Sequence, residues 1–340
     1  MSEPDLYNRS GFVASVLPIL DRDGAPCRVV IVKASYAIQV GGPLQLAERP
    51  RDVRLGDELW GPPEIPDLRL PGDFCPAKVG TDFVLSGHAM PPSGQACNRV
   101  DVGIRVADRV KLMRVHGPRA WRRSLLGVVP GPSEPMRATP LSWSRAYGGL
   151  DLSEPDRPLE EPRNPVGSGV ARHTDRLVGT PAPQIEALDE PIGAAGGRFA
   201  PVGCAPLGRS FMPRRQTAGT YDAAWVKSGY PARPADYKEE HENCATEALV
   251  FREPLRGGEP VRITGVNATG ALDFMLPKLR LVVEAEIDGT AIERRPHLDT
   301  VVVDSDAMVL EMVWRALFRC PTKMRGRFTS VQVQAKEFQP

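Results

Sequence analysis

The 340-residue sequence is poor in cysteine and contains no two cysteines close together. A disulfide framework of a small secreted domain requires cysteines at short, characteristic spacings, and so does a zinc site. Neither pattern is present, so we predict reduced and mostly buried thiols. The six residues are Cys27, Cys75, Cys97, Cys204, Cys244 and Cys320.

An excess of charge of one sign is also missing. The 43 basic side chains are nearly balanced by 42 acidic ones, so the chain lacks the positive field that supplies most non-specific affinity for nucleic acids. No apolar run approaches the roughly 20 residues that span a bilayer. Residues 12–20, interrupted by Pro18, are too short for the apolar part of a secretory signal. We therefore expect a cytoplasmic protein that partners neither a nucleic acid nor a membrane.

The motifs that usually carry catalysis, metal binding or nucleotide binding are absent as well. The histidines show no helical pairing, the paired glycines have no Gly-Lys-Ser/Thr ending, and Ser168 lacks the spacing of a hydrolase nucleophile. Asp304 and Asp306 lack the other oxygen ligands of a calcium loop, so a turn explains them better. We predict no catalytic, cofactor-binding or metal-ligating residues, and no enzyme activity.

A hydrolase with a distributed site is the alternative from another class. It requires His88 or His173 to converge with an acid such as Asp82 or Asp175 in one pocket, with perturbed pKa values. Nothing in the spacing of these residues indicates such convergence.

What the sequence has in abundance is alternation of apolar and polar side chains with a period of two. In residues 29–40, Val30, Val32 and Ala34 lie on one face and Lys33 and Ser35 on the other, as in a half-buried strand. Turn residues of the Asp/Gly and Gly/Pro types bound this strand. Further strands are predicted at residues 79–85, 100–106, 111–115, 261–263, 272–276, 279–287, 298–303 and 309–317.

Residues 117–213 differ, because proline and glycine become dense and the periodic apolar patterns mostly disappear. Proline and glycine form about a fifth of the chain, below the roughly 25–30% typical of low-complexity disorder, so we expect long ordered loops. A short helix is predicted from Thr220, as its cap, to Gly229, and a second one near residues 236–244.

These patterns predict a mainly β fold with an antiparallel, sandwich-like core, as one large or two packed β lobes, with long Pro/Gly-rich loops and few short helices. Residues 1–117 are expected to form an N-terminal β region and residues 118–255 a loop-rich middle region. Residues 256–340 are expected to form a C-terminal β region that packs with the N-terminal one. Residues 329–340 are expected to be a short tail after the final strand, without a further domain.

Several segments together, in order along nearly the whole chain, carry a resemblance to a known family. The chain resembles a bacterial family of domains of unknown function that are encoded beside type VI secretion spike proteins and regarded as effector adaptors or chaperones. The matching segments are residues 21–24, 32–36, 78–88, 145–149, 161–167, 218–222 with Trp225, 255–261, and 298–301 followed by Trp314 and Arg315.

This resemblance implies a cytoplasmic protein that binds a toxin effector and helps to load it onto the spike tip, without a cofactor. A spike-tip protein is a second candidate partner. A structural component of the secretion apparatus, which would form a defined symmetric oligomer, remains an open alternative.

The motif residues themselves have a structural interpretation. We expect fixed turns at Gly148-Gly149 and at Asn164-Pro165, and a packed strand end at the Arg-Ala-Tyr segment. Two aromatic residues are expected to anchor a short helix against the sheet. The residues with these predicted structural roles are Arg145, Tyr147, Gly148, Gly149, Arg163, Asn164, Pro165, Gly167, Thr220, Tyr221, Asp222 and Trp225.

Overall fold

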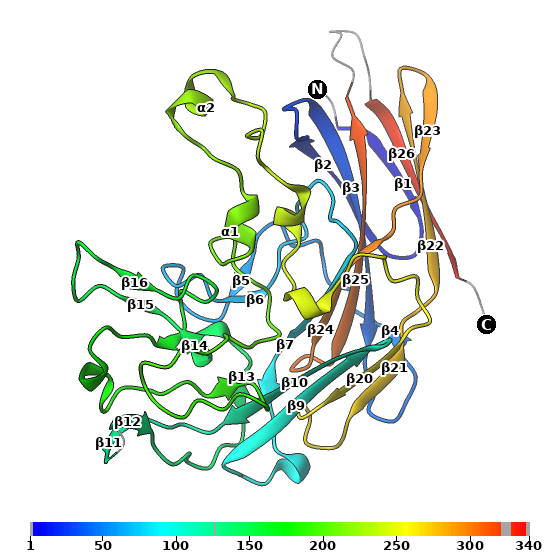
Figure 1. The fold of residues 1–340 in the computed structure, drawn as a ribbon. Coiled ribbons are helices and arrows are strands. Elements are labelled where there is room, and N and C mark those ends of the chain that lie inside the picture. Colours follow the sequence, from blue (N-terminus) through cyan, green and yellow to red (C-terminus); the bar gives the residue numbers. More distant parts are fainter. Residues whose placement is uncertain (1–2, 126, 321–327, 338–340) are drawn as a thin grey trace.

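The computed structural model describes residues 3–125, 127–320 and 328–337. Its largest element is a seven-stranded sheet that joins strands from both ends of the chain (Figure 1). In spatial order it consists of β19 (Val250–Phe251), β7 (Thr81–Ser86), β24 (Leu298–Asp304), β25 (Val309–Arg319), β3 (Pro26–Ala37) and β2 (Val13–Leu20), with β4 (Gln45–Leu46) paired to β3.

Two smaller sheets complete the main body. The five-stranded sheet consists, in spatial order, of β18 (Ile185–Glu186), β10 (Arg109–His116), β9 (Arg99–Val106), β20 (Pro260–Thr264) and β21 (Leu272–Met275). The four-stranded sheet consists of β1 (Asp5–Arg9), β26 (Phe328–Glu337), β22 (Leu279–Ile287) and β23 (Thr290–Arg294).

One hydrophobic core joins these three sheets. Its buried members include Val32 of β3, Ile104 of β9 and Val283 of β22. Ile104 and Val283 alternate with less buried neighbours along their strands, whereas β3 is buried on both faces. In Figure 1 the four-stranded sheet lies beside the long strands β3 and β25, and the five-stranded sheet lies at their lower end. The mainly β, sandwich-like fold predicted from the alternation is confirmed.

The middle of the chain contains short paired strands and ordered loops. The pairs are β5 (Glu58–Leu59) with β6 (Leu68–Leu70), β8 (His88–Ala89) with β13 (Thr139–Pro140), β11 (Trp121–Ser124) with β12 (Gly127–Pro130), β14 (Tyr147–Gly148) with β17 (Ser168–Gly169), and β15 (Leu150–Asp151) with β16 (Leu159–Glu160). Trp121, Val128, Tyr147, Ala182 and Ile192 form a small core of their own here.

Helical segments are short. They are α1 (Arg214–Thr217), α2 (Ala223–Ser228) and the 3₁₀ turns η1 (Pro92–Gly94), η2 (Trp143–Arg145), η3 (Thr174–Leu177), η4 (Glu239–Glu242) and η5 (Glu247–Leu249). The second predicted helix, near residues 236–244, is only the 3₁₀ turn η4. Among the described residues, no helix has the length and apolar character needed to cross a membrane.

One expectation about the strands was wrong. Residues 329–337 of the expected tail belong instead to strand β26, whose Val331, Val333 and Ala335 alternate with polar residues and pair with β22, while residues 338–340 lie outside the described residues. Residues 13–20, for which no strand was predicted, form β2, and Pro18 is accommodated because β2 is an edge strand and an edge tolerates a missing N–H donor. In the largest sheet one strand pair differs from the antiparallel others, since β7 runs parallel to β24.

The position of β26 gives a direct test. Val333 is fully buried in the main core, whereas the next residue, Gln334, is exposed. Val333→Asp buries an unpaired charge and is expected to destabilise the protein by about 3–5 kcal/mol, with Gln334→Asp as the matched control that leaves stability nearly unchanged. Urea denaturation of both variants measures the difference. Equal stabilities would contradict the placement of this strand.

Candidate protein-docking site

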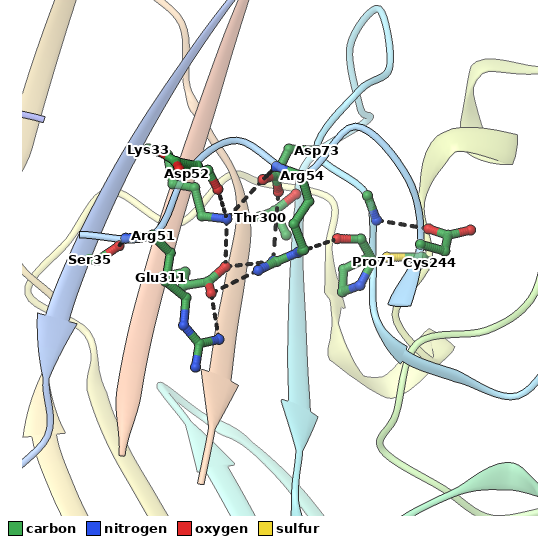
Figure 2. Close-up of polar contacts among 12 residues, drawn as sticks. Lys33, Ser35, Arg51, Asp52, Arg54, Pro71, Asp73, Cys244, Thr300 and Glu311 are labelled. Atoms are coloured by element: carbon green, nitrogen blue, oxygen red, sulfur yellow. Dashed lines mark hydrogen bonds and ion pairs between the residues drawn. The ribbon is translucent and has the colours of Figure 1, made fainter. Parts of the chain in front are cut away.

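On the face of the seven-stranded sheet opposite to the main core, charged side chains form a buried cluster. This ionic layer consists of Lys33, Arg51, Arg54, Asp73 and Glu311 (Figure 2). The Nζ atom of Lys33 lies 2.8 Å from Oδ2 of Asp73 and 3.0 Å from Oε2 of Glu311. Arg51 and Arg54 both donate to the Glu311 carboxylate. Each charge in the layer therefore lies beside an opposite one.

Strand alternation explains why these charges share one face. Val32 and Ala34 of β3 belong to the main core, so Lys33 between them points to the other side of the sheet. Residues 47–75 cross this second face and bring two arginines and an aspartate onto it (Figure 2). Burial by itself would raise the pKa of Glu311, but hydrogen bonds and charges from Arg54 and Lys33 lower it to about 2.

Two further buried ion pairs continue the same polar face. Arg315 of β25 pairs with Asp299 and donates to the backbone oxygen of Asp73 over 2.7 Å. Lys78 lies 2.8 Å from Asp82 of β7. Burial would raise the pKa of Asp82, but the charge and the hydrogen bond of Lys78 outweigh this effect and lower it. Lys33 and Arg315 of the sheet thus contact Asp73 and connect the sheet to the segment that covers it.

The residues considered for chemistry do not come together. His88 lies 2.8 Å from Asp306, and His173 lies 3.5 Å from Glu154, whereas Asp175 pairs with Arg123. Among the described residues no group of three His, Cys, Asp or Glu side chains is arranged to hold a metal ion. The pairing of His88 or His173 with Asp82 or Asp175 that a distributed hydrolase site requires is therefore not formed.

The cysteines are free thiols, as predicted, and all but Cys97 are buried. Burial raises the pKa of Cys204 and of Cys244 to about 12 and the pKa of Cys75 to about 11. Because the thiolate is the reactive form, these side chains are inert at neutral pH.

Two of the motif segments, residues 145–149 and 161–167, pack directly against each other. Asn164 is fully buried, and its Nδ2 donates to the backbone oxygens of Trp143 and Tyr147 over 2.8 Å and 2.9 Å. A Cβ atom on Gly148 would lie 2.2 Å from the Asn164 oxygen, and φ of Gly148 is +151°. Only glycine fits at this approach. A turn is present around Asn164 and Pro165, as expected, whereas Gly148 lies in strand β14 and not in a turn.

The neighbouring motif residues differ in their surroundings. Gly149 donates its N–H to the Asn164 oxygen over 2.8 Å, and Gly167 passes so close to Asn164 that a Cβ would not fit. Arg163 lies on the surface in a bidentate pair with Glu161. Pro165 follows in the same turn.

The predicted strand end at Arg145 and Tyr147 is half right. Tyr147 begins β14 and its hydroxyl donates to the Gly197 oxygen over 3.0 Å. Arg145 instead ends the 3₁₀ turn η2, is exposed, and donates to the side chain of Gln184 over 2.9 Å. The guanidinium of Arg145 stays at the surface of the loop, where the side chain of Gln184 accepts its hydrogen bond.

The remaining motif residues lie in a projection that we name the aromatic arm, residues 217–238. It contains α2 and stands away from the three sheets (Figure 1). Its base is closed by the N–H of Lys238, which donates to the Thr217 oxygen over 3.0 Å. Thr220 donates to both carboxylate oxygens of Asp236 through its N–H and its hydroxyl, over 2.9 Å and 2.7 Å.

A turn from the start of the chain supports the arm. The N–H of Arg233 donates to the Arg22 oxygen over 2.8 Å, and a Cβ on Gly24 would lie 2.7 Å from the Ala232 nitrogen. Gly24 has φ +76°, so the motif segment 21–24 has a glycine where the turn needs one and where the arm passes. The two chain regions hold each other in place.

Aromatic side chains gather at the tip of the arm. The ring of Trp225 contacts Tyr221 edge-on at 4.6 Å between centroids and Tyr230 at 6.3 Å, and its Nε1 donates to the Ala232 oxygen over 2.9 Å. Tyr221 is 45% exposed, Val226 68% and Tyr230 75%. The tip is therefore an ordered apolar surface that faces solvent.

The structure corrects the sequence interpretation of this segment. Asp222, and not Thr220, caps α2, because its Oδ1 accepts the N–H of Trp225 over 2.8 Å while Thr220 is engaged by Asp236. Tyr221 and Trp225 pack on each other and not against the sheet. Sequence reasoning missed Tyr230; its signal was a tyrosine between Gly229 and a proline, outside any apolar periodicity.

The fold and these surfaces define a mainly β protein with an exposed apolar cluster that is carried on a braced projection. Residues 23–315 match the model of a family described as an uncharacterized protein conserved in bacteria (DUF2169), and the chain belongs to this family. No curated protein and no solved structure matches the chain.

The lowered pKa of Glu311 predicts a pH dependence of stability. Its contribution is complete above its ordinary pKa of 4.5 and is lost as the pH falls toward about 2, because the carboxylate must then be protonated. Glu311→Gln is expected to destabilise the protein by about 3–5 kcal/mol at neutral pH and to weaken this acid dependence. Denaturant titrations across the acid range measure both effects. Glu293→Gln, in an exposed pair with Arg295, is the control, and an equal acid dependence in all three proteins would contradict the assignment.

Because Asn164 is buried and Arg163 is exposed, substitutions at these two neighbouring positions are expected to differ in their effect on stability. Asn164→Ala removes two buried hydrogen bonds and is expected to destabilise the protein by about 1–3 kcal/mol. Arg163→Ala removes an ion pair whose arginine is 51% exposed and is expected to change stability by less than about 1 kcal/mol. Thermal unfolding followed by circular dichroism compares the two, and a larger effect of Arg163→Ala would contradict this prediction.

Proposed function

We propose that this chain is a non-enzymatic adaptor that binds a toxin effector of a type VI secretion system in the bacterial cytoplasm and promotes its loading onto the spike tip. The resemblance carried by eight motif segments supports the link to secretion. The observation that carries a binding function is the tip of the aromatic arm, where Tyr221, Val226 and Tyr230 are exposed together.

Physical chemistry favours protein binding at this tip. Tyrosine and tryptophan are enriched among the residues that dominate the free energy of protein association. Large apolar groups gathered on an exposed projection mark interaction sites more often than they serve the fold. The arm is already held by Asp236, Ala232 and the turn at Arg22, so little conformational entropy is lost when a partner binds.

The proposed effector therefore docks on the tip, while the sheets provide a rigid body that holds the arm. A spike-tip protein is the second proposed partner, because loading requires that the effector and the spike meet. The chain acts in this scheme by bringing two proteins together and needs no reacting group.

The test purifies the toxin effector that the tagged chain retains from its native cytoplasm and titrates it against the wild-type chain by isothermal calorimetry. Tyr221→Ala with Tyr230→Ala is expected to weaken binding by roughly tenfold or more, since such anchors contribute about 1–2 kcal/mol or more each. Leu125→Ala, at a fully exposed leucine in the β11–β12 turn, is expected to leave the affinity unchanged. Both variants should unfold at the wild-type temperature, because none of these side chains is buried.

A pull-down of the tagged protein from its native cytoplasm, followed by mass spectrometry, provides the second readout. Recovery of the toxin together with a spike protein supports the adaptor function and identifies both partners. Recovery of neither, with turnover of a small substrate, overturns it in favour of a hydrolase. A defined symmetric oligomer without toxin affinity overturns it in favour of a structural component of the apparatus.

A further inference from the structure

A cleft of about 630 Å³ opens where the chain passes between the three sheets. Three connections form its walls: β19 to β20, β21 to β22, and β23 to β24. Each of them leaves one sheet and enters another. The cleft therefore lies at the junction of the main body and is distinct from the aromatic arm.

Two glycines of the motif segment 255–261 shape one wall. Gly257 and Gly258 have φ values of +86° and +89°, and a Cβ on Gly257 would lie 2.3 Å from the Pro277 oxygen. The chain before β22 can run this close only because no side chain intervenes. As a result, Lys278 lies directly beside the glycine pair.

The floor of the cleft is apolar. It is formed by five side chains that are at most 6% exposed and belong to the main core: Leu255, Leu281, Leu298, Met312 and Trp314. Apolar side chains of a ligand would lose contact with water on this floor, which favours binding by the hydrophobic effect.

The rim is cationic. It carries Arg256, Lys278, Arg280 and Arg295, and no Asp or Glu is among the described residues that line the cleft. Arg295 is paired with Glu293 at 2.7 Å. Within the described part of the chain, Arg256 and Lys278 form no ion pair. In a chain whose total charge is nearly balanced, this one-sided lining is a local feature.

We propose that the cleft binds an acidic segment of a protein partner, with apolar side chains on the floor and carboxylates at Arg256 and Lys278. This inference rests on the proposed adaptor function and deepens it by naming the chemistry of the segment that is recognised. Its volume is in the range of about 300–1,000 Å³ typical of ligand pockets, so it admits a short stretch of chain and not a folded domain. The buried apolar floor fits a peptide better than a nucleic-acid backbone, whose contacts are with phosphate.

The first experiment measures binding of a fluorescein-labelled peptide of alternating glutamate and leucine to the full chain by fluorescence anisotropy. We expect saturable binding that weakens as ionic strength rises, because salt screens exposed charges. The double variant Arg256→Glu with Lys278→Glu is expected to lose affinity by roughly tenfold or more, since like charges then face each other. Arg105→Glu, on the exposed side of β9, is the control and should bind as the wild type does.

The outcomes separate this inference from the proposed function. No saturable binding of the acidic peptide, or equal binding by wild type and double variant, overturns the cleft assignment. Equal or tighter binding of a lysine-leucine peptide, or of a single-stranded oligothymidylate, to the same cleft also overturns it. If the wild-type chain captures the purified toxin and the double variant captures it equally well, the adaptor function stands and the cleft assignment falls. If the wild-type chain captures no toxin, the adaptor function falls, and the peptide titration alone decides about the cleft.

Discussion

The buried ammonium of Lys33, held between the carboxylates of Asp73 and Glu311, determines how the largest sheet is covered. A charge can be buried at tolerable free energy only when an opposite charge and hydrogen bonds replace its water. Lys33 and Glu311 are fixed on adjacent strands β3 and β25, whereas Asp73 belongs to the segment that crosses above them. The segment 47–75 must therefore occupy one position, because any other would leave charges unpaired.

This arrangement gives the sheet two different faces. One face packs on the four- and five-stranded sheets through apolar side chains. Because apolar packing is non-directional, it fixes the distance between the sheets more than their register. The other face is joined to the segment 47–75 by the ion pair of Lys33 with Asp73 and by the hydrogen bond of Arg315 to the Asp73 oxygen, which are directional and specify partners. A small apolar cluster that includes Ile31, Val313 and Phe74 also lies on this face. Sheets held together in this way can carry the aromatic arm at one place and the cleft between the three sheets at another.

The strands were predictable from the sequence, because alternation in residues such as Val30, Val32 and Ala34 is a local signal. The same signal was present in Val331 and Val333 of β26, and the error there was to treat the end of the chain as a tail. The ionic layer was not predictable, since Arg51 and Glu311 lie 260 positions apart and only the pairing of β3 with β25 brings them together. The cap at Asp222 depended on a similar long-range fact, because Asp236 engages Thr220, the other candidate.

The motif segments fall into two groups by what the fold requires of them. Asn164 and Gly148 are buried against each other, and their contacts stabilise this part of the fold whatever the protein does. Tyr221 and its neighbour Tyr230 are exposed, and removing their rings would leave the sheets and the base of the arm intact. An exposed aromatic ring on a braced projection lowers solubility without stabilising the core, so the fold alone does not account for it. The proposed binding partner would account for it, because the same rings would then pass from water into an apolar contact.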